Sequence, residues 1–565
     1  PTNAAGRAGP PEAPSVGLPP CTSDGSLTIR PVSVDDLRQQ LRERGYLSHG
    51  IERWFALDPW SSRAFWLELV TVALKAATLI AAFAALPFTA IMLFRNYPLH
   101  ALETFGLFVT YGAAWFLAAF AFVIVVALVL KVRPSLPIDT PRALLAISIV
   151  ASALFVAPLA VWWSHFDASP STGELVTGAA LAAAFFVVTA VVVSAALLSF
   201  SIYELQRIPA IHQKPRGVPM AVGAAVLIAL LFVPAYAQRE RPEPEPMIVT
   251  TPTTRNVALI AVDGLTADIL QSRPDLARAL PYVAAMAPLA GDSTTERWAS
   301  LGTGVPTDAH GVRAIEGVRF RGGRHILQRI SSGDFVLMRM APLLGIARRE
   351  PLPPTVRRRD YVWELFAKRG VPVVAANWWT TTESHDGALI SIAPESIFAA
   401  AKGDPLRVDA AAASRFFAAI DRTRPRFATV YLPALDVILN RLERDRSTQL
   451  GQSLRALDGV VAAIARARAR GYEVVLTGLP GDHQAGQGVI ASTIRLQPVP
   501  KPWDVAPTVL DLLGFPLSRE MPGRSLATTT PEPRIATYGS RESTGAAATV
   551  NEEYYENLKS LGYIQ

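Results

Sequence analysis

Five long apolar stretches dominate the first half of the chain. They cover residues 76–94, 104–130, 143–163, 175–200 and 217–237, and none of them contains Asp, Glu, Lys, Arg or His. About 20 helical residues span the hydrocarbon core of a bilayer, whereas the buried helices of a soluble core rarely stay uncharged over such a length. The pattern therefore predicts a multi-pass α-helical membrane domain with five transmembrane helices.

The pattern changes after residue 255, where short apolar runs alternate with longer amphipathic segments. The short runs at 256–262, 372–376, 427–431 and 472–476 are typical of buried strands, and 360–369, 410–420 and 448–470 have helical spacing. Strands that alternate with helices predict an α/β domain with a mostly parallel central sheet. Ligands of such sheets bind beyond the carboxyl ends of the strands, where Asp263 and Asn377 fall.

Composition shifts predict where these regions begin and end. Residues 1–28 are rich in Pro, Gly, Ala and Ser and read as disordered, and a Pro/Glu-rich stretch follows the last apolar run. The predicted organisation is a tail at 1–28, a cytoplasmic amphipathic segment at 29–63, the membrane domain at 64–237, a linker at 238–255, the α/β domain at 256–526 and a C-terminal tail with a short helix at 527–565.

Charge predicts the orientation and excludes several classes of protein. Lys131, Arg133 and Arg142 follow the second apolar run, whereas the loop after the third run has neither Lys nor Arg. Because cytoplasmic loops are the positive ones, the N-terminus is predicted to be cytoplasmic and everything after residue 237 extracytoplasmic. No charged cluster interrupts the spans, which argues against a transporter. The net charge of +7 without a recognisable nucleic-acid module argues against nucleic acid, and Cys21, the single cysteine, excludes a disulfide framework.

Four motifs in order carry a resemblance to a known family. They are NVALIAVDGLTADIL at 256–270, STTERWASLGTGVPTDAHGV at 293–312, YVWELFAKRGVPVVAANWWTTTESHDGALIS at 361–391 and WDVAPTVLDLLGFPLSREMPGRSL at 503–526. Together with the terminal NLKSLGYIQ, they resemble the type I phosphodiesterase/nucleotide pyrophosphatase branch of the alkaline-phosphatase superfamily. The resemblance implies an alkaline-phosphatase-like fold for the α/β domain.

The resemblance also implies a two-zinc site that transfers phosphoryl groups through a hydroxyl nucleophile. Thr294 matches the nucleophile, and Asp263, Asp436 and His483 match metal ligands. Two of them have a plainer alternative: Asp263 precedes Gly264 as in a turn, and a Thr at a helix start, such as Thr294, is commonly an N-cap. Thr295 is the alternative nucleophile.

Several of the family's metal ligands are missing from their expected places. Asn440 stands where the resemblance places a His ligand of the second metal, four residues after Asp436, and residues 477–480 read TGLP where the family has S-D-H-G. An Asn amide is a poor zinc ligand. A slipped alignment would use Asp482 and His483 as a displaced ligand pair, at the expense of the last His. The predicted cofactor is therefore zinc or another divalent metal, as one ion or none.

Three further residues are candidates for substrate binding. Arg297, next to the predicted nucleophile, could pair with a phosphate or lie on a solvated helix face. Asn377 and Asn440 offer polar groups at strand ends. Trp378 and Trp379 could stack on a substrate ring, although packing is the commoner role of such residues.

Two hypotheses for function follow. The first is a phosphodiesterase or phospho-group transferase, anchored in the bacterial inner membrane with its α/β domain in the periplasm, that acts on a phosphorylated or otherwise anionic envelope substrate. The alternative is a catalytically inactive pseudoenzyme of the same fold that binds a ligand or a partner in envelope assembly. In both, the bilayer is a partner; the oligomeric state is left open.

Overall fold

A computed structural model describes residues 40, 63–96, 99–132, 141–164, 172–200, 248–289, 291, 293–329, 336–385, 387–443, 445–482, 484–528, 534–541 and 552–564. Residues Val70–Gln565 form one unit, which holds both the apolar helices and the α/β domain. The preceding unit, Pro1–Leu69, contributes only Gln40 and the start of the first apolar helix to the described residues.

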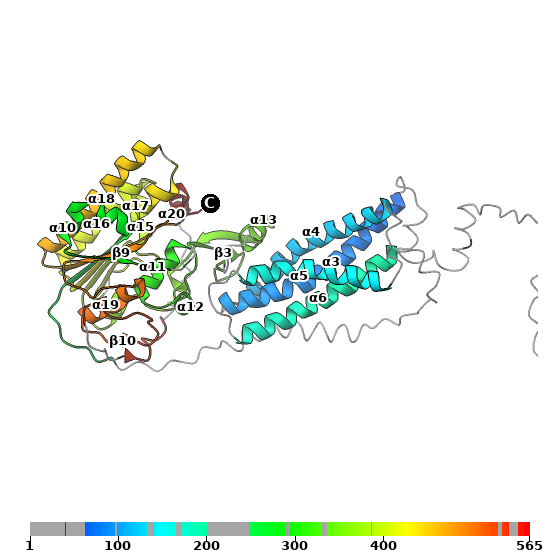
Figure 1. Cartoon of the computed structure of the whole chain (residues 1–565), viewed down its shortest axis with the longest axis horizontal. Coiled ribbons are helices and arrows are strands. Elements are labelled where there is room, and N and C mark those ends of the chain that lie inside the picture. Colours follow the sequence, from blue (N-terminus) through cyan, green and yellow to red (C-terminus); the bar gives the residue numbers. More distant parts are fainter. Residues whose placement is uncertain are drawn as a thin grey trace, which may run out of the picture. The chain divides into compact units, whose positions relative to one another are not determined.

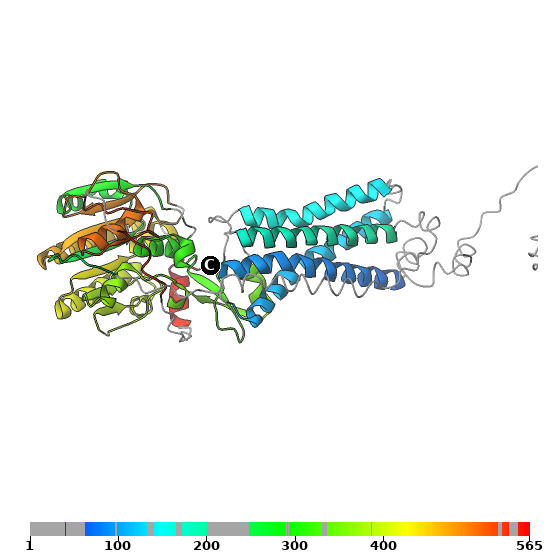
Figure 2. The same ribbon diagram turned by 90° about the horizontal axis from the view of Figure 1, so that it is seen from below.

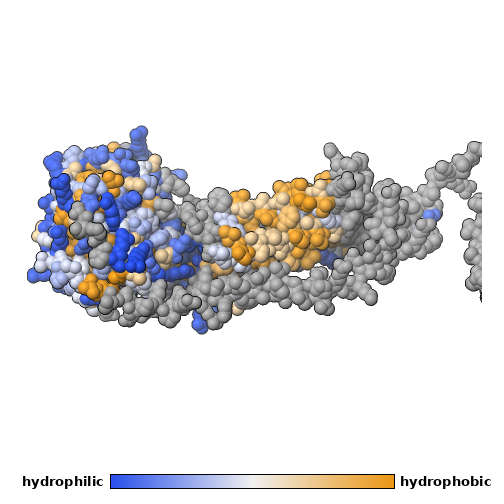
Figure 3. Space-filling model, turned by 60° about the horizontal axis from the view of Figure 1, so that its bottom comes forward, coloured by the Kyte–Doolittle hydropathy of each residue, from blue (hydrophilic) through white to orange (hydrophobic). Residues whose placement is uncertain are grey.

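Four described helices are long and apolar enough to cross a membrane (Figure 1). They are α3 (Arg63–Asn96), α4 (Ala101–Val132), α5 (Pro141–Ser164) and α6 (Thr172–Phe200). The surface of these helices is largely hydrophobic, whereas that of the α/β domain is mostly hydrophilic (Figure 3). Four of the five predicted spans are thus present as helices, and the fifth, at 217–237, lies outside the described residues.

The α/β domain is built on a sheet of seven strands in the order β2-β9-β8-β1-β7-β5-β6. The strands are β1 (Val257–Asp263), β2 (Tyr282–Met286), β5 (Val373–Ala376), β6 (Leu389–Ile392), β7 (Phe427–Leu432), β8 (Glu473–Leu479) and β9 (Gly488–Ser492). Every described pairing among them is parallel except those of β9 with β8 and with β2. The prediction of a mostly parallel sheet is therefore confirmed.

Helices cover both faces of the sheet, as a sheet that is apolar on both sides requires (Figure 2). All seven residues of β1 are buried, with Val257–Val262 pairing β7 and Val257–Asp263 pairing β8. The covering helices are α9 (Ala267–Gln271), α10 (Pro274–Ala279), α11 (Thr294–Thr303), α12 (Thr307–His310), α14 (Val362–Lys368), α15 (Pro394–Ala401), α16 (Pro405–Thr423), α17 (Ala434–Asp436), α18 (Arg446–Ala469) and α19 (Val505–Leu512). Short turns and strands complete the domain: η2 (Pro354–Val356), η3 (Val437–Arg441), η4 (Pro502–Asp504), β10 (Leu517–Ser518) and β11 (Arg534–Ile535).

A two-stranded arm, residues 316–351, extends from the α/β domain onto the apolar helices. It consists of β3 (Glu316–Phe320), the π-helical turn η1 (Val336–Met340), α13 (Ala341–Leu343) and the antiparallel β4 (Ala347–Pro351). Its buried residues share one hydrophobic cluster with α3, α4 and α5. Polar contacts reinforce this packing, because Glu103 accepts hydrogen bonds from the backbone N–H groups of Arg324 and His325. The sequence did not reveal this arm.

The end of the chain packs back onto the α/β domain. Helix α20 (Glu552–Ser560) and the residues after it bury Tyr554, Leu558, Tyr563 and Ile564 in the main core. The C-terminal segment therefore belongs physically to the same packed unit as the sheet.

Candidate functional site

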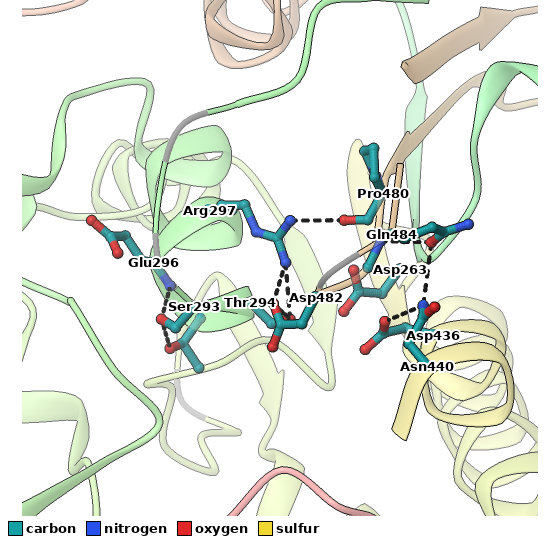
Figure 4. Close-up of polar contacts among 12 residues, drawn as sticks. Asp263, Ser293, Thr294, Glu296, Arg297, Asp436, Asn440, Pro480, Asp482 and Gln484 are labelled. Carbon is teal, nitrogen blue, oxygen red and sulfur yellow. Dashed lines mark hydrogen bonds and ion pairs between the residues drawn. The ribbon is translucent and has the colours of Figure 1, made fainter. Parts of the chain in front are cut away.

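The candidate site lies at the carboxyl edge of the parallel strands. Asp263 is the last residue of β1, Asp436 ends α17 shortly after β7, and Asp482 follows β8. Because β7, β1 and β8 are parallel neighbours, their carboxyl ends bring these carboxylates to one edge. Helix α11 begins at the same place with Thr294 (Figure 4).

Thr294 is buried at the N-terminus of α11, where a helix offers free backbone N–H groups. Ser293 caps this helix, and its hydroxyl accepts a 3.2 Å hydrogen bond from the Glu296 N–H. Gly304, in the left-handed region at φ 72°, ends the helix. The sequence thus positions Thr294 by an ordinary cap and stop, and the helix dipole favours negative charge in front of it.

Arg441 lies between the carboxylates. Its Nε donates to Asp436 Oδ2 at 2.6 Å, and its Nη2 donates to Asp482 Oδ2 at 2.7 Å and to Thr294 Oγ1 at 2.8 Å. Its side chain is only 7% exposed and that of Asp436 is 0% exposed. Burial by itself would lower the pKa of Arg441, but the charges of Asp436, Tyr563, Asp482 and Asp263 together raise it. A permanent cation is therefore held among the residues that resemble the family's metal ligands.

Arg297 supplies a second guanidinium from the first turns of α11. Its Nη1 donates to the Pro480 carbonyl at 2.9 Å, and its Nη2 donates to Asp482 Oδ1 and, at 3.4 Å, to Thr294 Oγ1 (Figure 4). Its Nε is buried and has no hydrogen-bond partner among the described residues. Both arginines thus hold the Asp482 carboxylate beside the Thr294 hydroxyl.

Asp263 lies behind this network and is fully buried. Tyr431 donates a 2.7 Å hydrogen bond to its Oδ2, while its Oδ1 has no partner in the described part of the chain. Burial, and next the charge of Asp436, raise the pKa of Asp263 to about 7. Near neutral pH, this carboxyl therefore carries its proton much of the time.

Amide groups stand where imidazole ligands are expected. The Asn440 Nδ2 donates to Asp436 Oδ1 at 2.9 Å and to Gln484 Oε1 at 3.3 Å, and Gln484 Oε1 also accepts from the Gly481 N–H at 2.7 Å. A Cβ at Gly481 would lie 1.8 Å from Asp436 Oδ1, so only glycine permits this approach. The loop after β8 is therefore closed down onto Asp436 by amide hydrogen bonds.

An aromatic wall backs the arginines. The Arg441 guanidinium lies 4.3 Å from the centre of the Tyr563 ring, close enough for a cation–π contact. Tyr563 packs edge-on against Trp379 at 5.2 Å, and Trp379 packs against Tyr431 at 5.9 Å. The C-terminal segment thus contributes a side chain to the site.

These donors do not fit a pair of zinc ions. Within the described residues there is no group of three or more His, Cys, Asp or Glu placed to hold a metal. More directly, the space among Asp436, Asp482 and Thr294 is taken by guanidinium groups that already hydrogen-bond the carboxylates. A guanidinium is a donor only and repels a divalent cation.

The structure brings most of the predicted site residues together. Thr294 and Asp436 meet through Arg441, Arg297 contacts Thr294, and Asn440 contacts Asp436. Asp263 lies directly behind them, since a Cβ on Gly264 would approach the Asp436 backbone N to 2.7 Å. Their predicted roles as nucleophile, metal ligands and substrate-binding residues stay predictions.

Two predicted residues are not part of this network as the structure describes it. Asn377 is buried at the end of β5 and donates to the Tyr431 carbonyl at 2.9 Å, so it braces the strand edge beneath the site. Its neighbour Trp378 is also a core residue, which donates to Thr429. His483 lies outside the described residues.

Sequence reasoning missed Arg441, Tyr431 and Tyr563. Asp482 was noticed only as part of a displaced ligand pair, and its carboxylate does enter the site. Arg441 follows Asn440, the very residue that replaces an expected His. An arginine next to a lost ligand was the available signal.

Comparisons with known proteins give one family match and likenesses to solved structures. Residues 257–489 match the model of the family described as type I phosphodiesterase / nucleotide pyrophosphatase. A structure of a 2-O GAG sulfatase has a TM-score of 0.32 and 12% identity, covering 48% of this chain and 73% of that chain. Phosphonoacetate hydrolase from Sinorhizobium meliloti, in complex with phosphonoformate, has a TM-score of 0.30 and 13% identity, covering 42% of this chain and 60% of the hydrolase. No curated protein matches the sequence. The match confirms the resemblance to this family over residues 257–489, whereas the fourth motif, at 503–526, lies beyond it.

Proposed function

We propose that this chain is a catalytically inactive member of its family, a membrane-anchored protein that binds a phosphorylated or similar anionic ligand without metal. The single observation that supports this most is Arg441, whose guanidinium joins Asp436, Asp482 and Thr294. In a metal-dependent relative, cations polarise the phosphate and activate the hydroxyl. Here, the nearest cations are arginines, which can bind a phosphate oxygen but cannot generate an alkoxide at neutral pH.

The same arginines make the site suitable for an anion. Arginine presents a planar fork of N–H donors that matches carboxylate and phosphate oxygens. The Asp482 carboxylate already receives hydrogen bonds from Arg297 and Arg441, so it occupies the position that a ligand phosphate would take. Asp482 is also 24% exposed and lies on a loop, so it can give way to a ligand without unfolding the core.

We also propose a membrane topology from the charge pattern of the chain. Five spans cross a bacterial inner membrane, the N-terminus is cytoplasmic, and the α/β domain is on the periplasmic side, where it faces phosphorylated envelope molecules. The excess of Lys and Arg after the second apolar run, at Lys131, Arg133 and Arg142, supports this orientation. Cysteine-accessibility labelling at the loop ends would test it, because Cys21 is the only native cysteine to remove.

The deciding experiment measures metal, turnover and anion binding on the purified full-length protein. We expect less than one equivalent of bound metal by elemental analysis, no hydrolysis of a chromogenic phosphodiester with added Zn²⁺, and a rise in melting temperature with inorganic phosphate. Thr294→Val is the control for turnover. Two zinc ions per chain with turnover that Thr294→Val abolishes would overturn the proposal in favour of the enzyme hypothesis.

Asp482→Asn sharpens the test. If Asp482 competes with the ligand, removing its charge should tighten phosphate binding by about tenfold, which corresponds to about 1.4 kcal/mol. Arg441→Met should abolish phosphate binding both in the native protein and in the Asp482→Asn variant. Weaker binding by Asp482→Asn would show that the carboxylate assists the ligand instead of competing with it.

A further inference from the structure

The tip of the arm exposes large apolar side chains to the surface. Leu343 is 78% exposed and Leu344 is 41% exposed, side by side at the end of α13. Removing apolar surface from water is favourable by roughly 25 cal/mol per Å². Two adjacent exposed leucines therefore mark a candidate contact surface for an apolar partner.

The buried side of the same tip packs on a membrane-spanning helix. Leu337 and Ala341 share a hydrophobic cluster with Leu107 and Tyr111 of α4. Gly106 makes the approach possible, because a Cβ there would lie 2.6 Å from the Phe320 ring. Two further leucine and phenylalanine side chains near the start of α4, Leu102 and Phe105, are 47% and 68% exposed.

The length of α4 places this contact at the edge of the hydrocarbon. Its candidate span, Ala101–Val129, has 29 residues, which is about 43 Å at 1.5 Å per residue and exceeds a hydrocarbon core of about 30 Å. A centred span therefore extends about 6 Å past the core at each end. Residues 106–111 of α4 then lie just inside the boundary, and the arm that packs on them lies at the same depth.

The arm also carries exposed basic side chains. Arg321, Arg324, Arg339 and Arg348 of the arm are exposed. No ion pair joins them to an acidic residue in the described part of the chain, whereas Arg319 and Arg349 of the same arm are paired with Glu350 and Glu316. A leucine pair within a set of unpaired arginines is the pattern of an element that lies in the interface of an anionic bilayer.

We propose that residues 336–344 of the arm are a membrane-interface element, which buries Leu343 and Leu344 among lipid acyl chains and sets the neighbouring arginines against anionic headgroups. The proposal goes beyond anion binding at Thr294 and is independent of it. It adds a membrane contact to that of the predicted spans, and it commits to lipid as the partner of this surface.

The arm is also tied to the candidate site. The Gln328 backbone carbonyl accepts a hydrogen bond from the Asn96 side chain. The Gln328 side chain donates to the Gly311 carbonyl and accepts from the Arg313 N–H. The Arg313 carbonyl in turn accepts from the hydroxyl of the cap residue Ser293. An interface element at the arm tip would thus hold the N-terminus of α11 at a constant height above the lipid surface.

Site-directed spin labelling tests the proposal on the full-length protein. With Cys21→Ser as the background, a nitroxide at Leu343→Cys in liposomes of phosphatidylcholine and phosphatidylglycerol should collide several-fold more often with oxygen than with a water-soluble nickel chelate. Leu450→Cys on α18, which is 62% exposed, is the matched control, and there the ratio should be reversed. Both positions are exposed, so neither label disturbs the fold.

The outcomes separate the partners. A water-like label at Leu343→Cys, equal to that at Leu450→Cys, would overturn the proposal. Spin–spin broadening at position 343 in dilute liposomes would assign the surface to a second copy of the chain and would also overturn it. In liposomes of phosphatidylcholine alone the label should lie less deep, and an equal depth would overturn the assignment of anionic headgroups to the arginines.

Discussion

Two buried arginines show how differently this chain uses the same side chain. Arg357, which is 0% exposed, gives Nη1 and Nη2 to the two oxygens of Glu364 at 2.6 and 2.7 Å and stacks 3.9 Å from the centre of the Tyr361 ring. Arg441 also stacks on a tyrosine, but divides its donors among Asp436, Asp482 and Thr294. We refer to these as the Arg357 cluster and the Arg441 cluster.

The difference lies in charge balance. In the Arg357 cluster, one guanidinium pairs with one carboxylate. Burial would raise the pKa of Glu364, but Arg357, together with Arg541 and the Tyr361 N–H, lowers that pKa. In the Arg441 cluster, two arginines face Asp263, Asp436 and Asp482, and the excess acid is relieved because Asp263 takes a pKa of about 7. A matched pair stabilises a fold, whereas an unmatched set with a hydroxyl among it can exchange a carboxylate for a ligand.

The largest expected effect is on the matched pair. Arg357→Met should lower the free energy of unfolding by about 3–5 kcal/mol, because it leaves the Glu364 carboxylate buried without its ion-pair partner. Thermal unfolding of the detergent-solubilised protein measures it. Arg407→Met is the control, since Arg407 is 69% exposed and its ion pair with Asp404 should contribute about 0–1 kcal/mol. Equal losses for both would remove the distinction between buried and exposed pairs.

Removing Arg441 should lower the free energy of unfolding less than removing Arg357, but it should weaken phosphate binding more. Arg441→Met should lower the free energy of unfolding by about 1–3 kcal/mol, since partly exposed Asp482 can rehydrate, Asp436 keeps the hydrogen bond from Asn440, and Asp263 can hold its proton. The phosphate-induced rise in melting temperature should disappear. Arg441→Lys keeps the charge without the fork and should recover only part of it. If phosphate still shifts the melting temperature of Arg441→Met by the full amount, the ligand binds elsewhere.

A further effect depends on pH and concerns His310, which feels the charge of Arg357. Burial, with smaller contributions from Arg313 and Arg357, lowers the pKa of His310 to about 3. The unfolded chain has a value near 6.5, so below that pH the unfolded state binds the proton first and stability falls by about 1.4 kcal/mol per pH unit until about pH 3. Melting temperatures from pH 7 to pH 4 should show this slope, and His310→Gln should flatten it. An unchanged slope in the variant would show that other groups carry the acid sensitivity.

The smallest expected effect concerns the cap of the site helix. Ser293→Ala should cost about 1 kcal/mol by removing the acceptor for the Glu296 N–H. Asp445→Ala removes the comparable cap of α18 and should cost a similar amount. Only the Ser293 variant should also weaken phosphate binding, because only α11 points at the Arg441 cluster. Equal binding by both variants would separate the cap from the site.

Much of the fold was predictable because it follows from local pattern. The apolar runs exceed the length of a bilayer, so four spans appear as helices in the described residues. The runs at 256–262, 427–431 and 472–476 became β1, β7 and β8, since continuous apolar segments between amphipathic helices have few other solutions. The arm at 316–351 was not predictable, because its buried side chains are matched to α4, a partner more than 200 residues away in sequence.

The sequence by itself determined the long apolar helices, the parallel sheet, the family resemblance and the identity of the acidic residues at the strand ends, because each depends on spacing or on a contiguous motif. Only the tertiary structure decided which cation lies among those carboxylates. The guanidinium of Arg441 reaches Thr294 across 147 positions of the chain and Asp482 across 41. A replaced ligand is visible in a motif, but the cation that takes its place is selected by proximity in space, which spacing along the chain does not encode.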